Sequence, residues 1–352
     1  MKTIDLEKLV RPNILRLKPY SSARKEFSGG GRIFLDANEN SFGSPTSVPL
    51  NRYPDPLQLE VKDALSQIVG VRSEKMFLGN GSDEAIDLVL RVFCEPRADN
   101  IIICPPTYGM YEVSAETNDI EIRRVPLTEE FQLNVPAILD AIDPNTKLIF
   151  ICSPNNPTGN SMRREDVLSL LKAFEGIVVV DEAYIHFSDH ESFISEILRY
   201  QNLMILQTFS KAWGLAGLRV GVAFADEGII EMMNRIKPPY NLSTIAQEII
   251  LEAIENQNKV ESSIAEILRE RARLKEGLEK IPCVEEIFRS DANFLLLKVR
   301  DADRVYKWLL EDAIIVRNRN TVELCEGCVR ITVGTREEND ALIESMGRFV
   351  NQ

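Results

Sequence analysis

The stretch from about residue 75 to residue 225 constrains the fold most, because short apolar runs alternate there with helical patterns. The runs are rich in β-branched residues and lack polar alternation, as expected of strands buried on both faces of a sheet. They comprise residues 101–103, 148–151, 177–180, 204–206 and 220–223. Alternation of this kind is typical of crossover units, so we predict an α/β fold with a mostly parallel sheet.

The chain changes character after residue 239, which predicts a second structural unit. A long charged helical pattern runs from residue 244 to about 279. It is followed by strand patterns at 294–297, 314–317 and 329–333 and by a helix near 303–310. The length of 352 residues exceeds the roughly 250–300 at which a single core usually divides. We therefore expect two domains, the second of α+β type.

Charge and cysteine usage exclude several classes of function. The chain carries 41 Lys and Arg against 54 Asp and Glu, a net charge of −13 that disfavours nucleic-acid and anionic-membrane partners. Apolar runs stay short of the ~18 residues of a membrane span, and the six scattered cysteines suggest reduced thiols, so we expect a cytoplasmic protein. Cys325 and Cys328 have C-x-x-C spacing but no second pair, so we predict no metal site.

Polar residues follow the apolar runs at the points where the strands should end. Ligands of open parallel sheets bind beyond the carboxyl ends of the strands, so these segments are the candidate site. They are 104–109, 152–159, 181–184 and 207–219. Together they supply a carboxylate, phenols, an amide and a lysine.

This set of groups suits a pyridine ring. Asp181 can pair with a protonated ring nitrogen, Tyr184 and Asn156 can hydrogen-bond the ring's phenolate oxygen, and Tyr108 can stack on the ring. Lys211 can form an imine with the cofactor and then move the proton between two carbons. The sequence therefore predicts pyridoxal 5'-phosphate as the cofactor and Lys211 as the catalytic residue.

A second group of residues predicts a cradle for the cofactor's phosphate. The glycine-rich turn 78–84 runs into an amphipathic helix, 83–93. The backbone N–H groups of Ser82 and Asp83 would face an anion at the N-terminus of this helix. Thr208, Ser210 and Arg219 add two hydroxyls and a guanidinium.

Each feature has a structural explanation when taken alone. A Gly-x-Gly turn before a helix is usually only a turn, Asp181 can cap the next helix, and Lys211 can be a surface lysine. The segment 153–159 is also rich in ordinary turn formers. These explanations do not account for the position of every feature at a strand end of one sheet.

Three segments resemble the fold-type I, class I and II pyridoxal-phosphate-dependent aminotransferases: 156–159 (NPTG), 181–184 (DEAY) and 210–219 (SKAWGLAGLR). The resemblance extends over the whole chain to histidinol-phosphate aminotransferases, through 17–24, 36–40, 51–54, 104–111 and 329–338. It implies a seven-stranded type of sheet in a large cofactor-binding domain over 45–260. A small C-terminal domain over 261–352 would be completed by part of an N-terminal arm, 1–44.

The resemblance also implies further roles and a reaction. Tyr53 would cross a homodimer interface to the neighbour's cofactor phosphate, Arg330 would bind the substrate's carboxylate or phosphate, and Tyr20 and Arg317 would complete that anion pocket. The expected reaction is amino transfer between histidinol phosphate and 2-oxoglutarate in histidine biosynthesis. The two tyrosines could instead be packing aromatics, and the two arginines charges at a strand edge.

Three rival functions share this fold or cofactor. A phosphothreonine decarboxylase would also bind a phosphorylated amine, and an aminotransferase for aromatic or aliphatic amino acids would use the same catalytic groups. A cofactor-sensing regulator would carry an added basic DNA-binding domain, for which the acidic sequence gives no sign.

Overall fold

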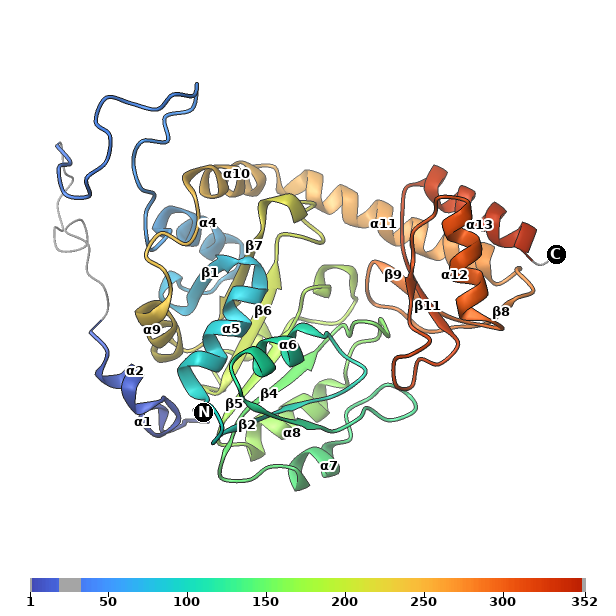
Figure 1. The fold of residues 1–352 in the computed structure, drawn as a ribbon, viewed down its shortest axis with the longest axis horizontal. Coiled ribbons are helices and arrows are strands. Elements are labelled where there is room, and N and C mark those ends of the chain that lie inside the picture. The colour runs from blue at the N-terminus through green and yellow to red at the C-terminus, as the bar shows by residue number, and fades with distance from the viewer. Residues whose placement is uncertain (1, 19–32, 350–352) are drawn as a thin grey trace.

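The computed structural model describes residues 2–18 and 33–349, and its larger unit is built on a seven-stranded sheet between two layers of helices (Figure 1). The strand order is β1-β7-β6-β5-β4-β2-β3. Strands β2 to β6 pair in parallel, whereas β7 runs antiparallel to both neighbours, which confirms the predicted mostly parallel α/β fold. The strands are β1 (Met76–Asn80), β2 (Asn100–Ile103), β3 (Glu121–Arg124), β4 (Thr146–Cys152), β5 (Ile177–Asp181), β6 (Leu203–Thr208) and β7 (Val220–Phe224).

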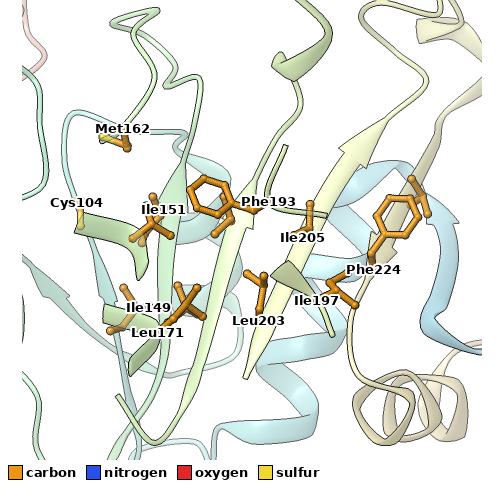
Figure 2. Packing of buried hydrophobic residues seen from close by; sticks show 14 of the residues in the cluster. Cys104, Ile149, Ile151, Met162, Leu171, Phe193, Ile197, Leu203, Ile205 and Phe224 are labelled. Carbon is orange, nitrogen blue, oxygen red and sulfur yellow. The ribbon is translucent and has the colours of Figure 1, made fainter. Parts of the chain in front are cut away.

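Alternate residues of the buried strands feed two separate hydrophobic cores. Leu148 and Phe150 face the layer formed by α5 (Gly81–Phe93), α6 (Met110–Thr117) and α9 (Glu227–Ile236). Ile149 and Ile151 face the opposite layer, and Figure 2 shows them with Leu203 and Ile205 in that core. The opposite layer contains α4 (Leu59–Val69), α7 (Val135–Asp140), α8 (Arg164–Ala173) and α10 (Thr244–Glu255). Burial on both faces explains the unbroken apolar runs.

The smaller unit is a four-stranded antiparallel sheet, in the order β10-β11-β9-β8, that lies apart from the large sheet (Figure 1). Apolar side chains of one face meet the helices α11, α12 and α13 in a separate core. The long helix α11 connects the two units (Figure 1). The bounds are α11 (Gln257–Leu278), β8 (Val284–Ile287), β9 (Phe294–Val299), α12 (Ala302–Glu311), β10 (Arg317–Asn318), β11 (Cys328–Thr332) and α13 (Arg336–Phe349). The predicted domain boundary between residues 260 and 261 falls within α11 and stays a prediction.

Two predicted elements of the C-terminal part differ from the structure. The helix expected over 244–279 is interrupted at Asn256, whose side chain donates to Glu252 O and so competes with the backbone of the helix. The strand expected over 314–317 is reduced to β10. Ala313 has a positive φ, and the Ile314 N–H still bonds back to Leu309 O, so the extended chain begins later.

The first described residues of the chain contact the large unit. Helices α1 (Leu6–Leu9) and α2 (Pro12–Arg16) place Val10 and Ile14 in the core beside α5 and α9. Arg11 adds an ion pair with Glu95 at 2.9 Å. The assignment of residues 1–44 to an arm that forms part of the small domain stays a prediction.

Four short 3-10 helices complete the described elements: η1 (Ser73–Lys75), η2 (Ile185–Phe187), η3 (Phe193–Glu196) and η4 (Ala216–Leu218). None of the helices in the described ranges combines the length and the apolar character needed to cross a membrane.

Candidate active site

A cavity opens where β4, β5 and β6 end, at the carboxyl edge of the large sheet. The last residues of these strands, Cys152, Asp181 and Thr208, all line it. The remaining lining residues come from the α5 terminus and from segments near the strand ends: Gly81, Ser82, Asp83, Tyr108, Asn156, Ala183, Tyr184, Ser210, Lys211 and Arg219. Its position is the one expected for the ligand site of an open parallel sheet.

Asp181 is a buried carboxylate, with only 2% of its surface exposed. The Tyr111 hydroxyl donates to its Oδ2 at 2.7 Å, and the Ala183 N–H donates to its Oδ1 at 3.1 Å. Burial raises the pKa of Asp181 to about 6, although both hydrogen bonds act in the opposite direction. A cation placed beside this carboxylate would therefore favour its charged form.

Lys211 follows β6 and shares the cavity with Asp181. Its Nζ lies 5.6 Å from the centre of the Tyr184 ring. Partial burial lowers the pKa of Lys211, and the positive charges of Arg330 and Arg219 lower it further. The amine thus loses its proton more easily than a surface lysine, which a nucleophile or a general base requires.

The N-terminus of α5 also lines the cavity and forms a candidate anion site. Gly81 begins the helix with φ +71°, and the N–H groups of the first turn lack partners within the helix. A Cβ at Gly221 would lie 2.2 Å from the Ser82 nitrogen, so only glycine lets β7 approach this turn so closely. Arg219 lies here as well, with Nη2 at 3.4 Å from Asp83 Oδ2 and Nη1 at 3.5 Å from Ser210 Oγ.

Arg330 from the small sheet reaches the rim of the site on the large unit. Its guanidinium donates to Asn156 Oδ1 and lies 5.1 Å from the centre of the Phe294 ring. Phe294 in turn meets Tyr184 edge-on, at 5.2 Å between ring centres. Because Asn156 accepts from Arg330 through its oxygen, its NH₂ group remains available as a donor.

These groups fit pyridoxal phosphate. The helix terminus and Arg219 suit a phosphate, the buried Asp181 suits a protonated ring nitrogen, and Lys211 suits an aldehyde. The glycine at position 221 leaves room for the phosphate turn that a Cβ would displace. The donor set therefore matches both ends of this cofactor.

The structure brings ten of the predicted cofactor-binding residues to one cavity: Ser82, Asp83, Tyr108, Asn156, Asp181, Tyr184, Thr208, Ser210, Lys211 and Arg219. Arg330 contacts this group through Asn156, and Arg317 lies across from Arg330 on β10, with its side chain exposed. Their individual roles stay predictions.

One predicted residue of the described ranges lies elsewhere. Tyr53 lies outside the cavity, where it is 49% exposed and stacks on Tyr240 at 4.4 Å between ring centres. Its exposure is compatible with a contact to a second subunit. Tyr20 lies outside the described residues.

The sequence analysis did not identify Tyr111, whose hydroxyl donates a hydrogen bond to Asp181. The available signal was its place in the segment 104–111, which also contains Tyr108, and the two rings meet edge-on at 5.6 Å between their centres. Gly81 and Ala183 also line the cavity, next to the predicted Ser82 and Tyr184, and so does Cys152, the first residue of the predicted segment 152–159.

The C-x-x-C segment does not take part in the site. Burial raises the pKa of Cys325 to about 12 and that of Cys328 to about 11, so both remain thiols at neutral pH. Within the residues that the structure describes, no three His, Cys, Asp or Glu side chains are grouped to hold a metal ion.

Comparisons with known proteins point in the same direction as the geometry. The family model "Aminotransferase class I and II" matches residues 37–346. A histidinol-phosphate aminotransferase of Cytophaga hutchinsonii is 53% identical over 345 residues, which cover 98% of this chain and 99% of the relative. The crystal structure of the histidinol-phosphate aminotransferase from Clostridium acetobutylicum matches with a TM-score of 0.80 and 25% identity, over 86% of this chain and 91% of that chain. The fold is also shared with the enzyme of the same name from Sinorhizobium meliloti, in complex with pyridoxal-5'-phosphate, with a TM-score of 0.79, 22% identity and coverage of 90% and 89%.

Proposed function

The chain belongs to the class I and II aminotransferases, and from this we propose that it transfers an amino group from histidinol phosphate to 2-oxoglutarate. The products are imidazole acetol phosphate and glutamate, in histidine biosynthesis. The enzyme is a pyridoxal-phosphate-dependent transaminase, and its relatives of about 50% identity over the full chain carry the name of this activity. The observation that carries the proposal is that Lys211 and Asp181 line one cavity together with the N-terminus of α5 and Arg219, which suit an anion.

When bound, pyridoxal phosphate supplies an aldehyde that links covalently to amines and a ring that withdraws electrons from the bond to be broken. Ser82, Asp83, Thr208, Ser210 and Arg219 would hold its phosphate. Asp181 would hold its ring nitrogen, Asn156 and Tyr184 its phenolate oxygen, and Tyr108 one face of its ring.

The chain's own groups then perform binding and proton transfer. Arg330 donates to Asn156, which lines the cavity, so its guanidinium can take the carboxylate of glutamate or the phosphate of the other substrate in a forked contact. Lys211 accepts a proton from one carbon and returns it to another, because its lowered pKa makes the neutral amine accessible.

The experiment mixes purified protein with histidinol phosphate and 2-oxoglutarate and measures glutamate and carbon dioxide. We expect glutamate to form. Because histidinol phosphate has no carboxylate to lose, a second reaction with phosphothreonine as the substrate tests the decarboxylase alternative, and there we expect no carbon dioxide. A panel of aromatic and aliphatic amino acids, compared with phosphorylated donors, separates this activity from that of other aminotransferases.

Replacing Lys211 with Ala tests the catalytic residue. Loss of the covalent attachment should remove both the visible absorbance of the bound cofactor and all turnover. Lys298→Ala, at an exposed lysine of β9, is the matched control and should leave both unchanged. Turnover retained by Lys211→Ala would refute the assignment.

We also propose that the enzyme is a cytoplasmic homodimer in which Tyr53 contributes to the partner's site. Its six cysteines are free and buried, as suits a reducing compartment, and Tyr53 is exposed on the surface. Mixing the inactive variants Lys211→Ala and Tyr53→Phe should restore part of the activity, since hybrid dimers would contain one intact site. A monomer in analytical ultracentrifugation would contradict this arrangement.

A further inference from the structure

Three arginines project from one face of the small sheet. Arg317 of β10 lies directly opposite Arg330 of β11 in their antiparallel pair. Arg319 is two residues beyond Arg317, and its N–H donates to Cys328 O at 2.9 Å, so the extended pairing continues to this residue. Residues two apart in a strand share a face, so Arg317, Arg319 and Arg330 all belong to the same side.

This side of the small sheet borders the candidate active site. Leu296, which pairs with Arg330, belongs to the core of the large unit, and Phe294 of the same strand meets Tyr184 of the cavity. Arg330 itself donates to Asn156. The three arginines thus lie on the side of the small sheet that faces the cavity.

Arg319 differs from other arginines that are partly buried. Its Nε is inaccessible and has no hydrogen-bond partner among the described residues. By contrast, Arg271 donates to two backbone carbonyl oxygens and Arg273 pairs with Glu270 and Asp340. A buried donor without an acceptor costs the folded protein free energy, so a movement of the side chain that gives Nε an acceptor on a ligand would be favourable.

The charges in this region also require an anion. In the described ranges of the chain, no carboxylate forms an ion pair with Arg317, Arg319 or Arg330, although acidic residues outnumber basic ones in the sequence. Burial lowers the pKa of Arg330, and the charge of Arg319 adds to this effect. Three neighbouring guanidinium groups repel one another until a multivalent anion neutralises them.

We infer that Arg319 is a specificity-determining residue that binds the phosphate ester of the substrate together with Arg330 and Arg317. The inference rests on the proposed function, because the same pocket must also accept the carboxylate of glutamate. A phosphate ester carries up to two charges on three acceptor oxygens, whereas a carboxylate carries one charge on two. The third guanidinium therefore stabilises the phosphorylated substrate more than glutamate.

The test compares Arg319→Gln with the wild-type holoenzyme in separate half-reactions with each amino donor. Loss of one hydrogen bond to a charged group should lower kcat/KM for histidinol phosphate roughly 10- to 100-fold. For glutamate and for histidinol without its phosphate we expect a change below about 3-fold, since the singly charged and neutral groups depend less on this cation. Arg319→Lys should recover part of the loss.

Arg300→Gln is the matched control, because Arg300 is an exposed arginine of the same unit, directly after β9, and should leave all three donors unaffected. Equal losses for all donors in Arg319→Gln would indicate a structural role and overturn the inference. An unchanged kcat/KM for histidinol phosphate would overturn it as well.

Calorimetric titration of the holoenzyme with inorganic phosphate separates this inference from the proposed function. Weaker phosphate binding by Arg319→Gln than by wild type supports the anion site even if wild type fails to turn over histidinol phosphate, a result that would refute only the proposed function. Identical phosphate binding by the two proteins would refute the role of Arg319.

Discussion

Replacing Asp181 with Asn should stabilise the cofactor-free protein at alkaline pH while it destroys the cofactor site. Burial raises the pKa of this carboxyl from 3.8 to about 6. The folded state therefore binds the proton more tightly than the unfolded chain, so the penalty begins above about pH 3.8 and is complete above about pH 6. The full penalty amounts to about 3 kcal/mol, since a tenfold change in proton affinity corresponds to about 1.4 kcal/mol.

Asparagine removes the charge but keeps only one of the two acceptor oxygens that Tyr111 and Ala183 use. The lost hydrogen bond costs about 1 kcal/mol. At pH 8 the variant should therefore be about 2 kcal/mol more stable than the wild type. At pH 5 the advantage should shrink to less than about 1 kcal/mol, because the wild-type carboxyl is then mostly protonated.

Urea unfolding of both cofactor-free proteins at pH 5 and pH 8, followed by tryptophan fluorescence, measures this difference. A parallel titration with pyridoxal phosphate should show that the variant binds the cofactor far more weakly. An equal gain in the free energy of unfolding at both pH values, or a variant less stable than wild type at pH 8, would refute the claim that Asp181 is a buried charge without a cationic partner in the cofactor-free protein.

Two further substitutions test the supports of the site. Tyr111→Phe removes the donor to Asp181 Oδ2 and should weaken cofactor binding about tenfold or more, since a hydrogen bond to a charged group contributes about 1.5–3 kcal/mol. A spectrophotometric titration that gives the wild-type affinity for the cofactor would contradict this expectation. Gly221→Ala places a Cβ 2.2 Å from the Ser82 nitrogen and should lower the free energy of unfolding by about 1–3 kcal/mol in urea. Its control is Gly217→Ala, where no atom lies within 4 Å of the added carbon, and equal stability of the two variants would contradict the crowding argument.

The central part of the fold was predictable because its strands are buried on both faces. The continuous runs of β2, β4, β5 and β6 leave few alternatives to a parallel sheet, and polar residues that follow them line the cavity at its edge as predicted. The strands that the sequence did not reveal are of a different kind. Both β3 and β8 carry exposed charged residues, and β1 contains a glycine and ends in a polar residue. Their apolar signal is short, so partners in the folded sheet decide their conformation.

The same distinction applies to the site. Lys211 and Asp181 are adjacent to strong strand signals, so their meeting at one edge follows from topology. Tyr111 and Arg319 can be recognised only from the tertiary structure. Tyr111 approaches Asp181 across a helix–sheet contact, and Arg319 stands out because its Nε is buried without an acceptor. The spacing of residues in the sequence does not show that a buried donor lacks an acceptor.

Because β7 runs antiparallel to β6, one short segment between the two strands carries both Lys211 and Arg219. The chain leaves β6 at Thr208 and returns to the sheet at Val220 without a crossover helix, so the lysine and Arg219 belong to one continuous excursion. A single peptide-bond cleavage between residues 211 and 219 would consequently separate Lys211 from Arg219, one of the residues proposed to bind the phosphate. Cofactor binding should then weaken without being abolished, because the N-terminus of α5 still offers donors to the phosphate from an independent segment.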